Sequence, residues 1–84
     1  MSIFLYRLVY ATNMSSKHTE AFAENLRYLM GEMSICEFSK KIGIPQPTIS
    51  RYLNCQREVS LENLGKIADY FHESIDYLLG REKY

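Results

Sequence analysis

The stretch SICEFSKKIGIPQPTISRYLNC, residues 34–55, predicts two short helices that are joined by a tight turn. Ser34 and Glu37 have the S-x-x-E spacing of a capping box, which satisfies free backbone amides at a helix start. Gly43 adopts the left-handed conformation at no steric cost, so it predicts the end of the first helix. Pro47 is tolerated in the first turn of a helix but not in its interior, so a second helix begins close to this residue.

The predicted second helix has one apolar side and one polar side. Ile49 and Leu53 lie four residues apart, which places them on one face and predicts that they are buried. The other side carries amide, hydroxyl and guanidinium groups, which can hydrogen-bond to base edges in a DNA major groove. A core-anchored helix that displays such groups is typical of DNA recognition. The polar residues are Gln46, Thr48, Ser50, Arg51 and Asn54.

Length and composition predict one small globular domain. The chain has 84 residues, of which 46% are hydrophobic, and this suits a compact core rather than a disordered chain. The formal net charge is zero, but the charges are unevenly distributed. Residues 34–57 contain four basic and one acidic side chain, whereas residues 58–84 contain six acidic and three basic ones. The local charge of +3 over the predicted helix pair favours contact with phosphates.

The chemistry-bearing residues do not form a catalytic or metal-binding pattern. Cys36 and Cys55 have no histidine at metal-ligand spacing, so we expect no metal and no cofactor. Reduced thiols in a cytoplasmic protein are the simplest interpretation, although a disulfide between them is not excluded. The sequence has no glycine-rich phosphate loop and no carboxylate pair, and we do not expect an enzyme.

The two ends of the chain differ from its centre. In the N-terminal segment, residues 1–14, the run Ile3–Tyr10 is rich in β-branched and aromatic residues and predicts one short strand. This run is too short to span a membrane, and Arg7 interrupts it. Two interpretations stay open: the strand pairs with its copy in a homodimer, or Met14 is the natural start of the protein. We expect residues 81–84 to form a frayed tail.

Three further helices complete the predicted domain, residues 15–80. Either Ser16 or Thr19 caps the first of them, and Ser60 and Ser74 cap the other two. The residues expected on their apolar faces are, in chain order, Phe22, Ala23, Leu26, Leu29 and Met30, then Leu61, Leu64, Ile67, Ala68 and Phe71, and finally Ile75, Leu78 and Leu79.

Several motifs together carry a family resemblance. They are SICEFSKKIGI at 34–44, TISRYLN at 48–54, SLENL at 60–64, IADYF at 67–71 and SIDYLL at 74–79. Caps, glycine and helix spacing agree in all of them. Over roughly residues 19–80 the chain resembles the Cro/repressor-type helix-turn-helix family, also called the xenobiotic-response-element family.

The resemblance implies an all-α, five-helix, lambda-repressor-like fold whose third helix enters the major groove. It also implies a repressor of bacterial or phage origin that binds double-stranded DNA, at a partly palindromic operator, as a homodimer. The positions that face bases in the family hold Gln46, Pro47, Thr48 and Arg51 here, with Ser50 nearer the flank. The positions that touch phosphates hold Asn54, Gln56 and Arg57.

The sequence departs from the family pattern at five positions. Ile35 stands where a glutamine often clamps a phosphate, and Pro47 removes side-chain hydrogen bonding from a base-facing position. Ser39, Cys55 and Val59 stand where alanine, glycine and proline are common. A competing hypothesis is therefore a protein-interaction module on the same scaffold, antitoxin-like or antirepressor-like, with weak or no DNA binding and a protein partner.

Overall fold

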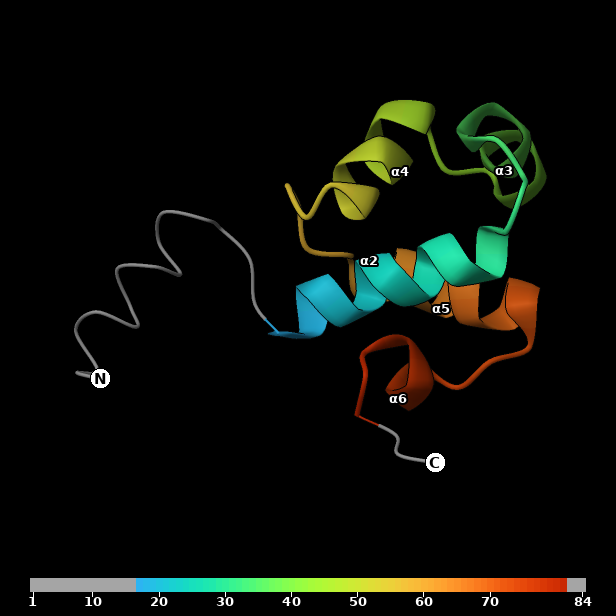
Figure 1. The fold of residues 1–84 in the computed structure, drawn as a ribbon. Helices are drawn as coiled ribbons and strands as arrows, with labels where there is room; N and C mark the ends of the chain where they lie inside the picture. Colours follow the sequence, from blue (N-terminus) through green and yellow to red (C-terminus); the bar gives the residue numbers. More distant parts are fainter. Residues whose placement is uncertain (1–16, 82–84) are drawn as a thin grey trace.

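The structure, a computed structural model, describes residues 17–81, and this part of the chain folds into helices and loops (Figure 1). The predicted all-α fold with five helices is confirmed. The strand predicted for Ile3–Tyr10 and most of the predicted tail lie outside the described residues. The helices are α2 (Lys17–Met30), α3 (Ile35–Ile42), α4 (Gln46–Leu53), α5 (Leu61–Phe71) and α6 (Ile75–Leu78).

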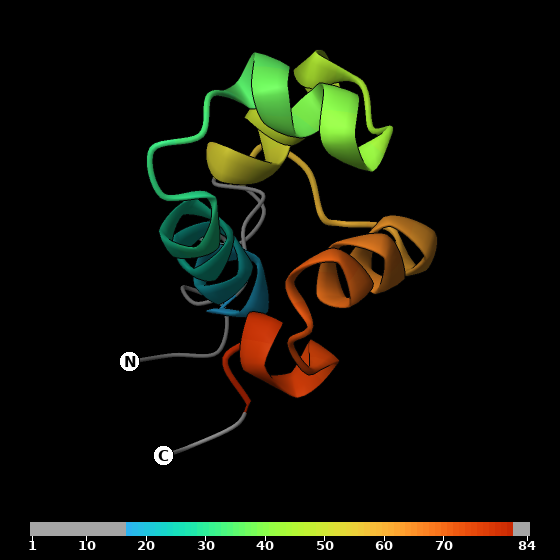
Figure 2. The ribbon, with the colours of Figure 1, turned by 90° about the vertical axis from the view of Figure 1, so that its right-hand side faces the viewer.

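Helices α3 and α4 form one end of the molecule, and α2, α5 and α6 form the body below them (Figures 1 and 2). Helix α2 packs against both α4 and α6, while α5 packs against α3 and α6. Polar contacts reinforce the junction of α2 with α6, because Asn25 Nδ2 donates to the Tyr77 carbonyl at 2.8 Å. The helix pair predicted from the sequence is thus carried on a three-helix support.

Serine side chains begin three of the helices, as predicted. The Ser34 hydroxyl accepts from the Glu37 amide at 3.0 Å, and the Ser34 amide donates to Glu37 Oε1 at 3.2 Å, which completes the capping box. Ser60 accepts from the Asn63 amide at 3.1 Å, and Ser74 caps α6 in the same way. Each cap satisfies an amide that the helix itself leaves without a partner.

Two glycines close helices where another residue would be strained. Gly43 has φ 79° and donates its amide to the Ser39 carbonyl at 2.9 Å, which ends α3 as predicted. Gly80 has φ 74° and ends the last helix, also as predicted. A Cβ on Gly80 would lie 2.6 Å from the Cβ of Ala21, so only glycine allows this close approach to α2.

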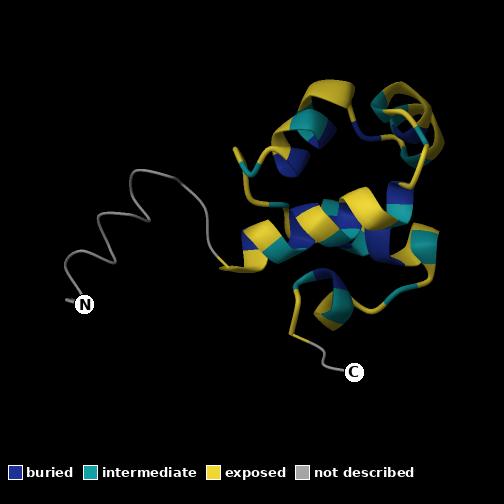
Figure 3. Ribbon diagram, in the orientation of Figure 1, coloured by how far each residue is buried: buried dark blue, intermediate teal, exposed yellow. Residues whose placement is uncertain are grey.

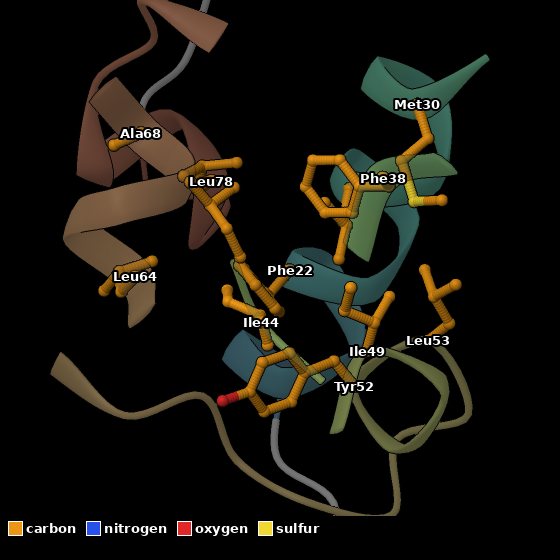
Figure 4. Close-up of a cluster of buried hydrophobic side chains, with 12 residues drawn as sticks. Phe22, Met30, Phe38, Ile44, Ile49, Tyr52, Leu53, Leu64, Ala68 and Leu78 are labelled. Atoms are coloured by element: carbon orange, nitrogen blue, oxygen red, sulfur yellow. The ribbon is translucent and has the colours of Figure 1, made fainter. Parts of the chain in front are cut away.

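A continuous core joins the helices (Figures 3 and 4). Ile49 and Leu53 belong to it, as the sequence predicts, with 0% and 9% of their surface exposed. Phe22 of α2 meets Tyr52 of α4 edge to face, with the ring centroids 5.8 Å apart. Phe38 of α3 stacks on Phe71 of α5 at 5.5 Å, so both halves of the molecule share one apolar interior.

Two details of the sequence prediction are wrong, and one of two alternatives is excluded. Leu61 and Ile75 are 87% and 45% exposed, although helical spacing placed them on the apolar faces of α5 and α6. Each is the first residue of its helix, and such a side chain projects beyond the helix end, where the described residues leave much of its surface exposed. Of the two residues predicted to cap α2, Thr19 does not do so, because the helix begins at Lys17 and Thr19 lies buried inside it, whereas Ser16 lies outside the described residues.

Candidate DNA-binding surface

Helix α4 begins without help from a capping side chain. Pro45 is its N-cap and has no side-chain acceptor, and Pro47 follows in the first turn. The Thr48 and Ile49 amides both donate to the Pro45 carbonyl, at 3.1 and 3.2 Å. The first turn has no acidic side chain, so no carboxylate offsets the positive end of the helix dipole there. A helix start of this kind favours an approaching anion such as a phosphate.

The inner side of α4 is fixed by packing and by one hydrogen bond. Ile49 is fully buried and Tyr52 is 1% exposed. The Tyr52 hydroxyl accepts from Asn63 Nδ2 of α5 at 2.9 Å. Tyr52 is thus a core residue, and its hydroxyl is engaged inside the protein and not directed to a phosphate. This contact joins α4 to α5.

The outer side of α4 and the loop after it carry all eight predicted contact residues. These residues share access to solvent, and they come from one helix and the three residues that follow its C-cap (Figure 3). Gln46, Pro47, Arg51, Asn54, Gln56 and Arg57 are exposed, and Thr48 and Ser50 are half-buried. The surface therefore offers amides, hydroxyls and two guanidinium groups over one helix length.

The end of α4 is held by a tight backbone turn. The Asn54 amide donates to the Ser50 carbonyl at 3.0 Å, and the Gln56 amide donates to the Arg51 carbonyl at 2.8 Å. Cys55 lies between them in the left-handed region, with φ 57°. This pattern is a Schellman-type helix end, in which glycine is usual at the left-handed residue. It keeps Asn54 and Gln56 beside the last turn of the helix.

A contact from α2 also reaches the end of α4. Arg27 Nη2 donates to the Leu53 carbonyl at 3.2 Å. A cation at a helix C-terminus offsets the negative end of the helix dipole and satisfies one of its free carbonyls. The sequence does not predict this contact, because an interaction over 26 positions leaves no local pattern.

The turn between α3 and α4 is anchored by residues on both sides of it. Ile44 is 1% exposed, so the turn is pinned into the core by its own side chain. Ser39 Oγ donates to the Ile44 carbonyl at 2.6 Å. Serine at this position thus adds a contact that alanine cannot make. Sequence analysis missed Ile44 as a core residue, although an isolated aliphatic residue between Gly43 and Pro45 was a usable signal.

Ile35 and the two lysines of α3 define the neighbouring surface. Ile35 is half-buried and packs against the core, which explains an apolar residue at this helix start. Lys40 and Lys41 are exposed in the last turn of α3, just before the turn that leads into α4. Both thiols are free, with Cys36 exposed and Cys55 half-buried.

The part of the chain that the structure describes contains neither a metal-binding cluster nor a membrane-spanning helix. Residues 17–81 contain no group of three or more histidine, cysteine, aspartate or glutamate side chains that could hold a metal ion. The helices of this region are also too short and too polar for any of them to cross a membrane.

Comparison with protein families identifies the arrangement. A family model described as helix-turn-helix matches residues 28–78, which run from the last three residues of α2 to the end of α6. Comparisons with curated proteins and with solved structures give no significant match. The matched family is one of DNA-binding regulatory domains and is not typically enzymatic. The match covers more than half of the chain, and the chain therefore belongs to the Cro/C1-type helix-turn-helix family.

Proposed function

We propose that the protein is a transcriptional repressor that inserts α4 into the major groove of a specific DNA operator. The observation that carries this proposal is the two-sided character of α4. Its inner side is fixed by the buried Ile49 and Tyr52, while its outer side holds the exposed Gln46 and Arg51 and the half-buried Thr48 and Ser50. Rigid presentation of such groups is what direct base recognition requires.

The side chains suggest a division of roles. The Gln46 amide can bond adenine with both of its polar atoms, and the Arg51 guanidinium can do the same with guanine. Thr48 can contact a thymine methyl group or a phosphate. Asn54, Gln56 and Arg57 lie at and beyond the C-terminus of α4, where they are suited to phosphates that flank the groove. Pro47 and Ser50 add van der Waals and short-range polar contacts.

The short length of α4 favours binding to DNA as a dimer. A single eight-residue helix covers few base pairs, so two copies on a partly palindromic operator would double the contacts. Half-sites about 34 Å apart would place both copies of α4 on the same side of the duplex. A dimer bound there would occlude a promoter. The local charge of +3 over residues 34–57 supplies the phosphate attraction that a neutral chain otherwise lacks.

The test replaces the recognition side chains singly. Arg51→Ala and Gln46→Ala should each weaken operator binding by about 1–3 kcal/mol, because each removes one two-pronged base contact. Binding should be measured by fluorescence anisotropy on a site selected from a random library, at several salt concentrations. Lys66→Ala is the matched control, since it removes an exposed positive charge from α5, outside the proposed surface. Unchanged affinity in both α4 variants would remove α4 as the recognition helix.

A second candidate is a protein-interaction module on the same scaffold, antitoxin-like or antirepressor-like. It is favoured by Ile35, which packs into the core where the family often uses a phosphate-clamping glutamine, and by the zero net charge. The two hypotheses separate at low salt, where a DNA-binding protein retains affinity even for random duplexes. Absence of any binding there would support the interaction module and reject the repressor.

A further inference from the structure

An apolar pocket of about 220 Å³ opens on the side of the molecule where the described chain begins. Its walls come from the start of α2, the loop before α5, the first turns of α5 and the residue after α6. Its apolar lining residues are Phe22, Val59, Leu61, Leu64 and Leu79. Leu61 stands at the same pocket with 87% of its surface exposed.

None of the pocket's lining residues is among the eight proposed DNA-contact residues, and none belongs to α3 or α4, although Glu58 directly follows Arg57. A hydrogen bond between two of the lining residues lies beside the pocket. His18 Nδ1 donates to the Leu79 carbonyl at 2.9 Å, which ties the start of α2 to the end of α6 beside the pocket. Liquid water occupies about 30 Å³ per molecule, so several waters would have to lie against apolar walls if nothing filled the space. An apolar guest that displaces them would be favoured.

We propose that the guest is the chain's own N-terminal segment, Ile3–Tyr10. The described chain begins at Lys17, and the next two residues, His18 and Thr19, line the pocket. The segment therefore reaches the pocket through only six intervening residues, 11–16, which span up to about 20 Å when extended. A tether this short gives an effective concentration in the millimolar range, which favours the attached segment over a separate molecule.

The chemistry of the segment matches that of the pocket. Its side chains include the aliphatic and aromatic groups Ile3, Phe4, Leu5, Leu8 and Val9, which suit an apolar site. Its one charge is the Arg7 guanidinium. The exposed carboxylate of Glu58 belongs to the pocket lining and Glu62 is exposed one residue after Leu61, so the acidic surroundings complement this cation.

The first experiment is a thermal-unfolding cycle on the full chain and on a chain that begins at Met14. Leu61→Gln should lower the melting temperature of the full chain by about 4–8 °C and leave that of the shorter chain nearly unchanged. Ile75→Gln is the matched control, because Ile75 is also an exposed aliphatic residue directly after a serine cap. It should have the same effect in both chains. Equal effects of Leu61→Gln in both chains would overturn the proposal.

The second experiment identifies the occupant. Sedimentation equilibrium should give the full and the shortened chain the same number of subunits. Removal of residues 1–13 should shift amide NMR signals around the pocket, such as those of His18, Leu61 and Leu79, but not those of α4. Loss of a dimer on shortening would overturn the proposal and assign the pocket to the segment of a second copy. Operator affinity is a separate measurement, so failure of this proposal leaves the proposed repressor function untouched.

Discussion

Helices α3 and α4 have eight residues each and lie next to each other, yet they are held in opposite ways. Helix α3 has a complete capping box at its start and Gly43 at its end, so its own sequence fixes both boundaries. Helix α4 starts at Pro45 without a side-chain cap and ends before Cys55, a non-glycine residue in the left-handed region. Local signals therefore define α3 far better than α4.

Tertiary contacts fix the position of α4, whose own sequence provides no side-chain cap. Its buried face holds three core residues against one for α3, and two polar contacts from other helices, Asn63 to Tyr52 and Arg27 to Leu53, reach it. No capping side chain bonds to the backbone amides at the start of α4. A recognition helix whose position is fixed by contacts on its buried face can thus expose its outer face to DNA and keep that position.

The largest effect on stability is expected from a core truncation in α4. Ile49→Ala should lower the free energy of unfolding by about 2–5 kcal/mol, because it removes a fully buried side chain on which the helix depends. Urea unfolding followed by circular dichroism measures the change. Ile42→Ala in α3 is the comparison, and it should cost less because Ile42 is only half-buried. Equal losses would mean that burial does not distinguish the two helices.

A smaller effect is expected from the cap of α3. Ser34→Ala removes the side-chain acceptor of the Glu37 amide and should cost about 1 kcal/mol. Glu37→Gln is the control, because a glutamine oxygen can still accept from the Ser34 amide and keep the box closed. The same urea experiment applies. A variant Ser34→Ala as stable as the parent protein would show that α3 is also held mainly by its tertiary contacts.

The same contrast explains which features the sequence could predict. The caps at Ser34, Ser60 and Ser74 and the end at Gly43 rest on short-range hydrogen bonds and backbone angles, and all of them are confirmed. Leu61 was misplaced because periodicity describes a helix interior and not its first residue.

Long-range contacts were less accessible from the sequence. The Tyr52 hydroxyl accepts from Asn63, eleven positions away, and Arg27 donates to the Leu53 carbonyl over 26 positions. For the candidate surface, the sequence identified solvent-accessible residues of one helix and loop. Which of them meet bases stays a prediction until DNA binding is measured.

The smallest and sharpest test concerns the end of α4. Cys55 has φ 57°, a conformation that costs a side-chain-bearing residue roughly 1–2 kcal/mol and glycine almost nothing. Cys55→Gly also loosens the unfolded chain, which offsets part of the gain, so the net stabilisation should be about 0.5–1 kcal/mol. Cys55→Ala is the control, since it removes the same thiol but keeps the Cβ. If the glycine and alanine variants are equally stable, the backbone at this helix end is not strained. If only the glycine variant is more stable than the parent protein, the left-handed backbone at residue 55 destabilises the end of α4.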